Sequence, residues 1–514
     1  MKKLFTFLII ISIILFSLVP VLWAQDAKTY FEQGNAHFSS GNYLEAIKSY
    51  DKALGLDSRD SRFYILRGAS YAAVGKYGEA IRDYDKAIEL NPKYAVTYSK
   101  RGEAYTALGN NGEAIKSYDR AIELNPKDAI LYARRGAAYA ALGNYQDAIR
   151  NCDAAIKLNP GYFEAYINRG IAYYMSGNYS EAIRNYDEAA QLNPKENTVN
   201  LLRGAPYASL GNYPEAIKSY DRAIELNPIY FEAYANRGLV YSMSGNYPEA
   251  IKNYDRAIEL NPKDMTTYRS RGDAYEKLGN DLEAIKNYDK VVEMNPKDAG
   301  VYYKLGNAYE RLGNYLEAIK NYDHVAEINP EHLEAYYKSA LALYASGQYT
   351  RAIENFNKAI RINPGFANAY YNRGVAYAVL GNPSEAIKDY DKAIDLNPKD
   401  PASYSRRGDA YVVLRDYPKA VFSYDKAIEL NQKDIDAYFN RGIAYSRSGK
   451  QTEAIRDFGT VIQLNPGFAN AYYNRAILFK EQNREDESLA DYRAAARLGD
   501  QGARFYLKSK KIAW

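Results

Sequence analysis

The chain has 514 residues, and 47% of them are hydrophobic, so it can bury a sizeable apolar core. Its 67 lysines and arginines nearly balance 63 aspartates and glutamates, which argues against a nucleic-acid-binding protein with a basic surface stripe. A single cysteine, Cys152, excludes an intrachain disulfide, and three histidines are too few for most metal or acid–base sites built on histidine.

The first predicted element is an N-terminal targeting segment. Two lysines precede an apolar run that ends at Trp23, and Ala24 and the polar Gln25 follow. Positive charge, an apolar stretch and a small residue occur in this order in secretory signal peptides. We therefore expect residues 1–24 to be a signal peptide and the mature chain to be periplasmic or secreted. The run is also close to the ~20 residues that cross a bilayer, so the alternative is a membrane anchor formed by residues 4–24.

From Ala27 onward the sequence repeats with a period of 34 residues. Glycine recurs at this interval from Gly34 to Gly442, and Ala340 stands at the one position within that series where it is absent. A fixed period of this length indicates a stacked array of structural repeats. With Ala27 as position 1, the array of residues 25–502 holds fourteen repeats without insertion or deletion. The repeats are 27–60, 61–94, 95–128, 129–162, 163–196, 197–230, 231–264, 265–298, 299–332, 333–366, 367–400, 401–434, 435–468 and 469–502.

Each repeat reads as two helices, and repeat 3 (residues 95–128) illustrates why. One face of the first helix is marked by Tyr98, Gly102, Tyr105 and Leu108. Gly109 and Asn110 then stop the helix, because both tolerate the left-handed conformation of a helix C-terminus. The apolar face of the second helix is marked by Ala114, Ile115, Tyr118, Ala121, Ile122 and Leu124. Pro126 ends it, since proline disfavours helix in the preceding residue.

This pattern closely resembles the tetratricopeptide repeat family. In repeat 2 the family's residues are matched by Tyr64, Gly68, Tyr71, Ala80, Tyr84, Ala87 and Pro92. The resemblance implies an all-α fold, a right-handed superhelical α-solenoid of tandem antiparallel helix hairpins. One departure is regular: position 7 is arginine and position 25 is aspartate in eleven repeats each. Ion pairing between these two positions of one repeat is plausible but not strict, because Arg441 shares its repeat with Gly459.

Two places in the array call for separate predictions. In repeat 6, position 4 is Asn200 instead of tyrosine, and Pro206 stands inside the first helix. An interior proline kinks or breaks a helix, so we expect a bend or opening between residues 27–196 and 231–514. After the last repeat, residues 503–514 read as a capping helix. Its Phe505, Tyr506 and Leu507 are expected to cover the last apolar face.

Nothing in the sequence predicts catalysis. Glycines at positions 8 and 15 have structural roles, and apparent phosphate-binding loops fail on spacing. Cys152 occupies position 24, where other repeats have tyrosine or phenylalanine, so we expect a buried thiol. His324 and His332 are the one pair that could share a metal across a turn. We predict no enzyme activity, no cofactor and no metal. The expected function is a scaffold that binds a protein or peptide, not nucleic acid; the alternative is an architectural or self-assembling element of the cell envelope.

The resemblance places the binding groove on the first helices, at positions 2, 5, 6, 9, 12 and 13. Most of the 54 tyrosines fall at four packing positions, but six stand at groove positions, and four of those six lie in repeats 9 to 11. Lysine or asparagine follows the tyrosine at position 5 in each of these repeats. The predicted partner-binding stripe is Tyr303, Lys304, Tyr337, Lys338, Tyr344, Tyr371 and Asn372. Tyrosine suits recognition because it offers a large contact area with one polar tip. Packing of the position-5 tyrosines on a neighbouring helix is the competing interpretation.

Overall fold

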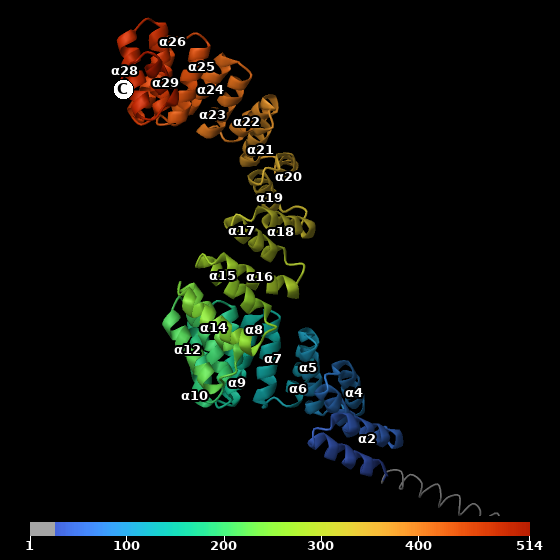
Figure 1. Cartoon of the computed structure of the whole chain (residues 1–514). Helices are drawn as coiled ribbons and strands as arrows, with labels where there is room; N and C mark the ends of the chain where they lie inside the picture. Colours follow the sequence, from blue (N-terminus) through green and yellow to red (C-terminus); the bar gives the residue numbers. More distant parts are fainter. Residues whose placement is uncertain (1–25) are drawn as a thin grey trace, which may run out of the picture. The chain divides into compact units, whose positions relative to one another are not determined.

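The computed structural model describes residues 26–514, which are helices joined by short turns (Figure 1). The predicted N-terminal segment, residues 1–24, lies outside this range. Repeat 1 begins with a helix over residues 26–39. The helices group into two compact parts, one ending at Thr267 and the other starting at Tyr268. Among residues 26–514, no helix is both long and apolar enough to cross a membrane.

All fourteen repeats form the same hairpin of a first and a second helix. The further first helices are α3 (Ser61–Ala73), α5 (Ala95–Ala107), α7 (Ala129–Ala141), α9 (Phe163–Met175), α11 (Asn197–Ser209), α13 (Phe231–Met243), α15 (Met265–Lys277), α17 (Ala299–Arg311), α19 (Leu333–Ala345), α21 (Ala367–Val379), α23 (Pro401–Val413), α25 (Ile435–Arg447) and α27 (Ala469–Glu481). The second helices are α2 (Tyr43–Leu56), α4 (Tyr77–Leu90), α6 (Asn111–Leu124), α8 (Tyr145–Leu158), α10 (Tyr179–Leu192), α12 (Tyr213–Leu226), α14 (Tyr247–Leu260), α16 (Asp281–Met294), α18 (Tyr315–Ile328), α20 (Tyr349–Ile362), α22 (Pro383–Leu396), α24 (Tyr417–Leu430), α26 (Gln451–Leu464) and α28 (Glu485–Arg497). One more helix, α29 (Gln501–Ser509), follows them.

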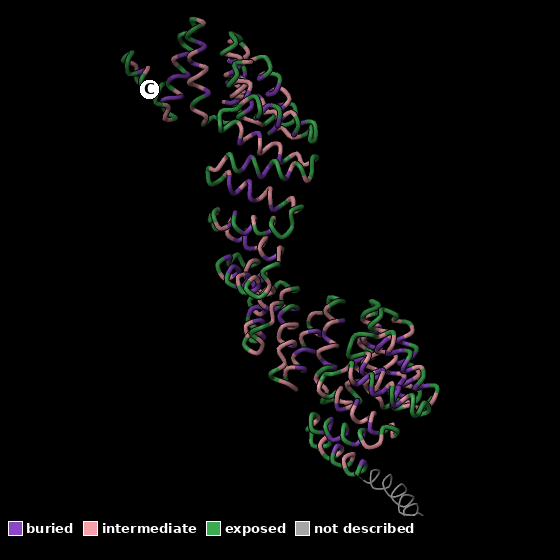
Figure 2. The backbone as a smooth tube through the Cα atoms, turned by 90° about the vertical axis from the view of Figure 1, so that its right-hand side faces the viewer, coloured by how far each residue is buried: buried purple, intermediate pink, exposed green. Residues whose placement is uncertain are grey.

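Small residues let the two helices of a hairpin approach closely. A Cβ atom on Gly102 of α5 would lie 2.6 Å from the ring of Tyr118 in α6, so a side chain does not fit there without displacement. Gly109 has φ of +74° in the turn between the two helices, as the sequence predicts. Buried residues recur along every hairpin on the sides that face other helices (Figure 2). The predicted all-α repeat architecture is therefore confirmed.

The position-7 arginines bridge adjacent repeats. Arg135 donates through Nη1 to Asp119 of the preceding repeat at 2.6 Å and through Nε to Asn151 of its own repeat at 2.7 Å. Its guanidinium also lies over the Tyr132 ring, 5.5 Å from the centroid. Salt bridges of this kind join Arg67 to Asp51, Arg101 to Asp85, Arg169 to Asp153, Arg203 to Asp187, Arg237 to Asp221, Arg407 to Asp391 and Arg441 to Asp425.

The suggested pairing of positions 7 and 25 within one repeat is therefore wrong by one repeat. In the eight salt bridges named above, the arginine bonds to position 25 of the repeat before it, and it also bonds to position 23 of its own repeat. Arg475 follows a glycine, Gly459, at that position 25 and bonds to Asp491 of its own repeat. Arg441 therefore has acidic partners although position 25 of its own repeat is Gly459. Asp425 of the preceding repeat and Asp457 of its own repeat both accept hydrogen bonds from it. Since each of the eight arginines contacts two repeats, this contact adds to the nearest-neighbour interfaces that stabilise a repeat array.

In repeat 6 the first helix is continuous, so Pro206 does not break it, and the expected bend or opening between residues 27–196 and 231–514 stays a prediction. Helix α11 runs from Asn197 to Ser209 through Pro206, and it packs against α10 and α12. The proline is buried, and its carbonyl still accepts a hydrogen bond from Leu210 at 3.1 Å. The proline removes the donor that would bond to Leu202, but the packing on both sides holds the helix together. The energetic weakness of this repeat stays a prediction.

The last helix caps the array, but it spans Gln501–Ser509 instead of the predicted residues 503–514, and one of its side chains also departs from the prediction. In α29, Ala503 and Leu507 are fully buried, and the Tyr506 ring stacks on Tyr492 with centroids 4.1 Å apart. Phe505 is 76% exposed, so the expectation that it covers the apolar face is wrong. The helical period places residues 503 and 507 on one face and turns residue 505 away from it.

Candidate functional site

The seven residues of the predicted stripe are all half-buried, and they lie on the first helices α17, α19 and α21. Tyr337 illustrates how the position-5 rings are held. Its centroid lies 4.8 Å from Phe366 and 6.0 Å from Phe356. The same contact with position 24 recurs in the pairs Tyr303–Tyr322, Tyr371–Tyr390, Phe439–Phe458 and Tyr473–Tyr492. These rings therefore contribute to the packing of their own hairpin, and only part of each is free to meet a partner.

The polar residues beside these rings already have partners within the chain. Lys304 forms a salt bridge with Asp273, and Lys338 forms one with Glu310 at 3.1 Å. The amide of Asn372 donates to the Tyr337 hydroxyl at 3.1 Å. A ligand carboxylate would have to compete with these acidic side chains, so this row alone is a poor site for an acidic peptide.

A first pocket opens between α17 and α19, next to the stripe. Its volume is about 580 Å³. It is lined by Asn307, Glu310, Arg311, Tyr315, Lys338, Leu341, Ala342 and Ala345. Arg311 also bonds to Asp281 at 2.7 Å and lies 3.1 Å from Glu276. The pocket therefore has a polar wall of paired charges and an apolar wall around Leu341.

A second pocket lies along α19, α21 and α23, and more of its lining residues are apolar than in the first pocket. Its volume is about 330 Å³. It is lined by Tyr344, Val375, Ala378, Val379, Gly381, Pro383, Tyr390, Arg406, Asp409, Ala410 and Val413. Val379 is 50% exposed and Val413 is 68% exposed, so two apolar side chains beside this hollow face solvent.

One charged pair borders the second pocket. Arg406 donates to Asp409 at 3.3 Å, and Asp409 also accepts hydrogen bonds from the Tyr424 hydroxyl at 2.8 Å and from Asn440 at 3.1 Å. Burial raises the pKa of Asp409, although these hydrogen bonds and the charge of Arg406 oppose that effect. The pair gives the apolar hollow a polar edge that can orient a bound segment.

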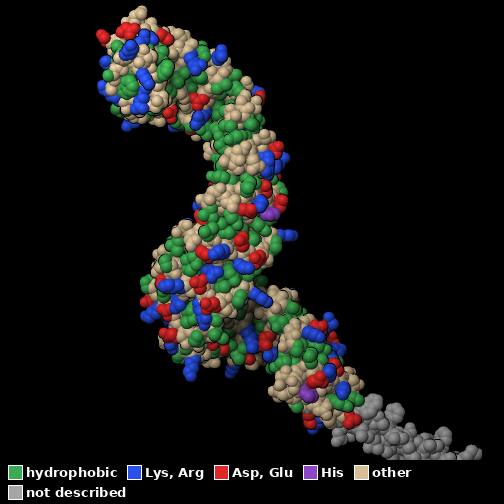
Figure 3. All heavy atoms as spheres, in the orientation of Figure 1, with side chains coloured by type: hydrophobic (Ala, Val, Ile, Leu, Met, Phe, Trp, Pro, Cys, Tyr) green, Lys and Arg blue, Asp and Glu red, His purple; other side chains and the backbone are tan. Residues whose placement is uncertain are grey.

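The predicted stripe and the pockets overlap in two residues. Lys338 lines the first pocket and Tyr344 lines the second, whereas Tyr303 and Tyr371 line neither. The sequence reasoning missed Val379 and Val413, which stand at position 13. The sequence did contain a signal for them: valine stands at position 13 only in these two repeats, and the other repeats have alanine, serine, methionine or a charged residue there. On the face of the molecule seen in Figure 3, lysine, arginine and acidic side chains are intermixed.

The other residues considered for chemistry are Cys152 and the pair His324 and His332. Cys152 is fully buried, as expected, and burial raises the pKa of its thiol to about 12. Among residues 26–514, no cluster of three or more His, Cys, Asp or Glu side chains is arranged to hold a metal ion. His332 accepts a hydrogen bond from the Ala335 amide, and His324 lies 3.0 Å from Glu327.

Comparison with protein families gives matches along most of the chain. Models described as "Tetratricopeptide repeat" match residues 303–365, 337–401, 439–503, 129–162, 231–264 and 163–196. A model described as "TPR repeat" matches residues 34–75, 70–109, 102–143, 204–245, 280–313 and 408–449. No curated protein sequence matches the chain significantly.

Several solved structures resemble parts or all of the array. The MamA protein is 30% identical over 33% of this chain and 92% of its own, with a TM-score of 0.32. YrrB, titled a TPR protein with an unusual peptide-binding site, is 27% identical over 36% of this chain and 96% of its own, with a TM-score of 0.34. The Cut9–Hcn1 structure is 15% identical over 96% of this chain and 98% of its own, with a TM-score of 0.39.

Proposed function

Because the chain belongs to the tetratricopeptide repeat family, we propose that it is a non-enzymatic scaffold that binds a segment of another protein on the face of its first helices. The observation that supports this face most strongly is the second pocket. Two exposed valines, Val379 and Val413, line it together with Tyr344. Exposed apolar surface beside a hollow favours protein contact, because covering it removes that surface from water.

The proposed ligand is an extended or helical segment that places an apolar side chain in the second pocket. Arg406 and Asp409 at the edge supply one donor and one acceptor for the segment's backbone or polar side chains. The first pocket, with Lys338 on its wall, continues the same face toward repeat 9. Size alone does not give affinity, so we expect the few apolar contacts in the second pocket to dominate.

The binding face is tested by adding charge to the second pocket. A partner is first captured by crosslinking and pull-down of the native chain, and its affinity for the purified protein is then measured. Val379→Glu together with Val413→Glu should weaken binding by more than tenfold, about 1.4 kcal/mol or more, because two carboxylates would be buried against apolar surface. Both valines are largely exposed, so the fold should persist.

Leu316→Glu is the matched control for this test. Leu316 lies on the second helix α18 and is 62% exposed. Its replacement by glutamate therefore puts a carboxylate in place of an exposed apolar side chain, as the valine changes do, but away from the pocket. Its affinity should stay near that of the unchanged protein. Equal weakening by both changes, or none by the valine pair, would reject the proposed face. Replacing Tyr303, Tyr337 and Tyr371 by serine is a poorer test, because these rings also pack within their hairpins.

We further propose that the scaffold works outside the cytoplasm. The support is the order of charge, apolar run and Ala24 at the N-terminus. N-terminal sequencing of the native protein should give a first residue near Gln25. A native chain that starts at Met1 and is found in the membrane fraction would instead support the anchor, and one that starts at Met1 in the cytosolic fraction would contradict export.

A further inference from the structure

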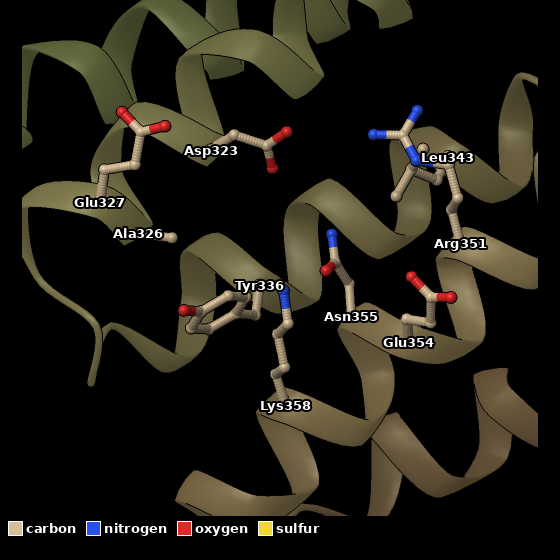
Figure 4. Close-up of a pocket in the computed structure, with 9 residues that line it drawn as sticks. All are labelled: Asp323, Ala326, Glu327, Tyr336, Leu343, Arg351, Glu354, Asn355 and Lys358. Carbon is tan, nitrogen blue, oxygen red and sulfur yellow. The ribbon is translucent and has the colours of Figure 1, made fainter.

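Repeat 10 is one of three repeats without an arginine at position 7. Position 7 holds Ser339, whereas it is arginine in eleven repeats. The Ser339 hydroxyl donates to Asp323 of the preceding repeat at 3.2 Å and accepts from Asn355 at 2.9 Å. Both partners line a cavity of about 330 Å³ that lies among α18, α19 and α20 (Figure 4). A serine is much shorter than an arginine, so the space of the missing side chain is left open.

The groups that hold a guanidinium in other repeats are all retained in repeat 10. In repeat 4, Arg135 uses an aspartate of the preceding repeat, an asparagine at position 23 and a tyrosine ring at position 4. The equivalent residues in repeat 10 are Asp323, Asn355 and Tyr336. All three line the cavity, and Figure 4 shows them on three different helices around it. The cavity is thus a guanidinium site whose own guanidinium is absent.

The charges around this cavity favour a cation. Three acidic residues, Asp323, Glu327 and Glu354, and two basic ones, Arg351 and Lys358, line it, which leaves one negative charge in excess. The guanidinium of Arg351 donates to Gln348 at 2.7 Å and so does not replace the missing one. Burial raises the pKa of Asp323, and Ser339, Arg351 and Lys358 only partly oppose it.

Lys358 occupies the ring face on which an arginine would stack. Its Nζ lies 5.2 Å from the centroid of Tyr336. Repeat 1 also lacks a position-7 arginine, and there Lys52 lies 5.2 Å over Tyr30 in the same way. A lysine at position 26 thus covers this ring in both repeats. An incoming guanidinium would displace the flexible ammonium, which costs little because Lys358 is largely exposed.

We propose that this cavity binds the guanidinium group of an arginine side chain presented by another protein. As in the contacts of Arg135, Asp323 accepts one of its N–H groups, Asn355 accepts another through its amide oxygen, and Tyr336 stacks on its plane. A protein-borne arginine suits the site better than the free amino acid, because Glu327 and Glu354 would repel a free carboxylate. The site lies among α18, α19 and α20 and shares no lining residue with the two pockets described above.

The test uses the full-length chain and small probes. N-acetyl-arginine amide should bind, measured by ligand-observed NMR titration, at least fivefold more tightly than N-acetyl-lysine amide or free arginine. The matching citrulline amide, which keeps the shape but loses the charge, should bind weakly or not at all. Asp323→Asn should weaken binding of the arginine probe at least fivefold, and Lys358→Met should strengthen it. Equal binding of arginine and lysine probes, or no effect of Asp323→Asn, would overturn the proposal.

Ser339→Arg provides a second and independent readout. The new side chain should occupy the cavity, abolish binding of the probe and raise the melting temperature, because it restores the contact that Arg135 and similar arginines make with the preceding repeat. A variant that keeps binding, or that melts earlier, would contradict an arginine-shaped site. Repeat 9 supplies the control: position 7 there is Leu305, which is buried and fills the space, so Asp289→Asn should leave probe binding unchanged.

Discussion

Replacing Arg441 with methionine should destabilise the array by about 3 kcal/mol or more, the usual range for removing one partner of a buried ion pair. Arg441 donates from Nε and Nη2 to the two oxygens of Asp457, at 2.8 and 2.7 Å, and from Nη1 to Asp425 at 2.6 Å. Asp457 is only 3% exposed, so methionine would leave a buried carboxylate without its cation. Urea unfolding followed by circular dichroism measures the loss.

Arg407→Met is the matched control, one repeat earlier in the chain. Arg407 makes the same bond to the preceding repeat, to Asp391, but its partner at position 23 is the neutral Ser423. The carboxylate left behind faces water, so the loss should be about 1 kcal/mol or less from the ion pair. Equal losses for the two variants would mean that buried charge is not what the arginine compensates. Adding Asp457→Ser to Arg441→Met should recover most of the difference.

The pH dependence of the Arg441→Met variant follows from the pKa of Asp457. Burial already raises that pKa, and Arg441 opposes the increase through its hydrogen bonds and its charge. Without Arg441 the folded-state pKa rises further above the unfolded value, so the folded state binds a proton more readily. Its stability deficit is then largest above the folded-state pKa and should shrink as the pH falls toward it. A deficit that grows on acidification would contradict this assignment.

Sequence periodicity predicted the helices closely, because the same local pattern recurs fourteen times. The turn at Gly109 and the close approach at Gly102 both follow from residues with no side chain. The partner of the position-7 arginines could not be read from one repeat. An aspartate 16 residues before the arginine and a residue 16 after it are equally distant in sequence, and only the stacking of repeats brings both within reach.

The candidate site was harder to predict than the fold. A tyrosine at position 5 stands on the correct helix face, but its ring leans on residues that the helical pattern does not connect to it, such as Phe366 at the end of the repeat. The helical period predicts on which face of the helix a residue lies, but it does not predict which residues the side chain contacts. The cavity beside Ser339 could likewise be interpreted only by comparison with the repeats in which an arginine side chain occupies the equivalent space.

Pro206→Ala combined with Asn200→Tyr should raise the free energy of unfolding by up to about 3 kcal/mol, the cost of a proline inside a helix. Alanine restores the donor to the Leu202 carbonyl, and ten other repeats carry alanine at this position. The tyrosine would give Arg203 the ring on which arginines of other repeats stack. Because each repeat stabilises its neighbours, strengthening repeat 6 should also merge separate unfolding steps into one, seen by calorimetry.

Pro214→Ala in the same repeat is the control for the proline effect. Pro214 lies in the first turn of α12, where the backbone amide has no helical acceptor, so its removal should change stability by only a few tenths of a kcal/mol. A large gain from Pro214→Ala, or no gain from Pro206→Ala, would mean that α11 accommodates its proline without strain. In that case the continuous helix from Asn197 to Ser209 would be as stable as its equivalents, and repeat 6 would not divide the array.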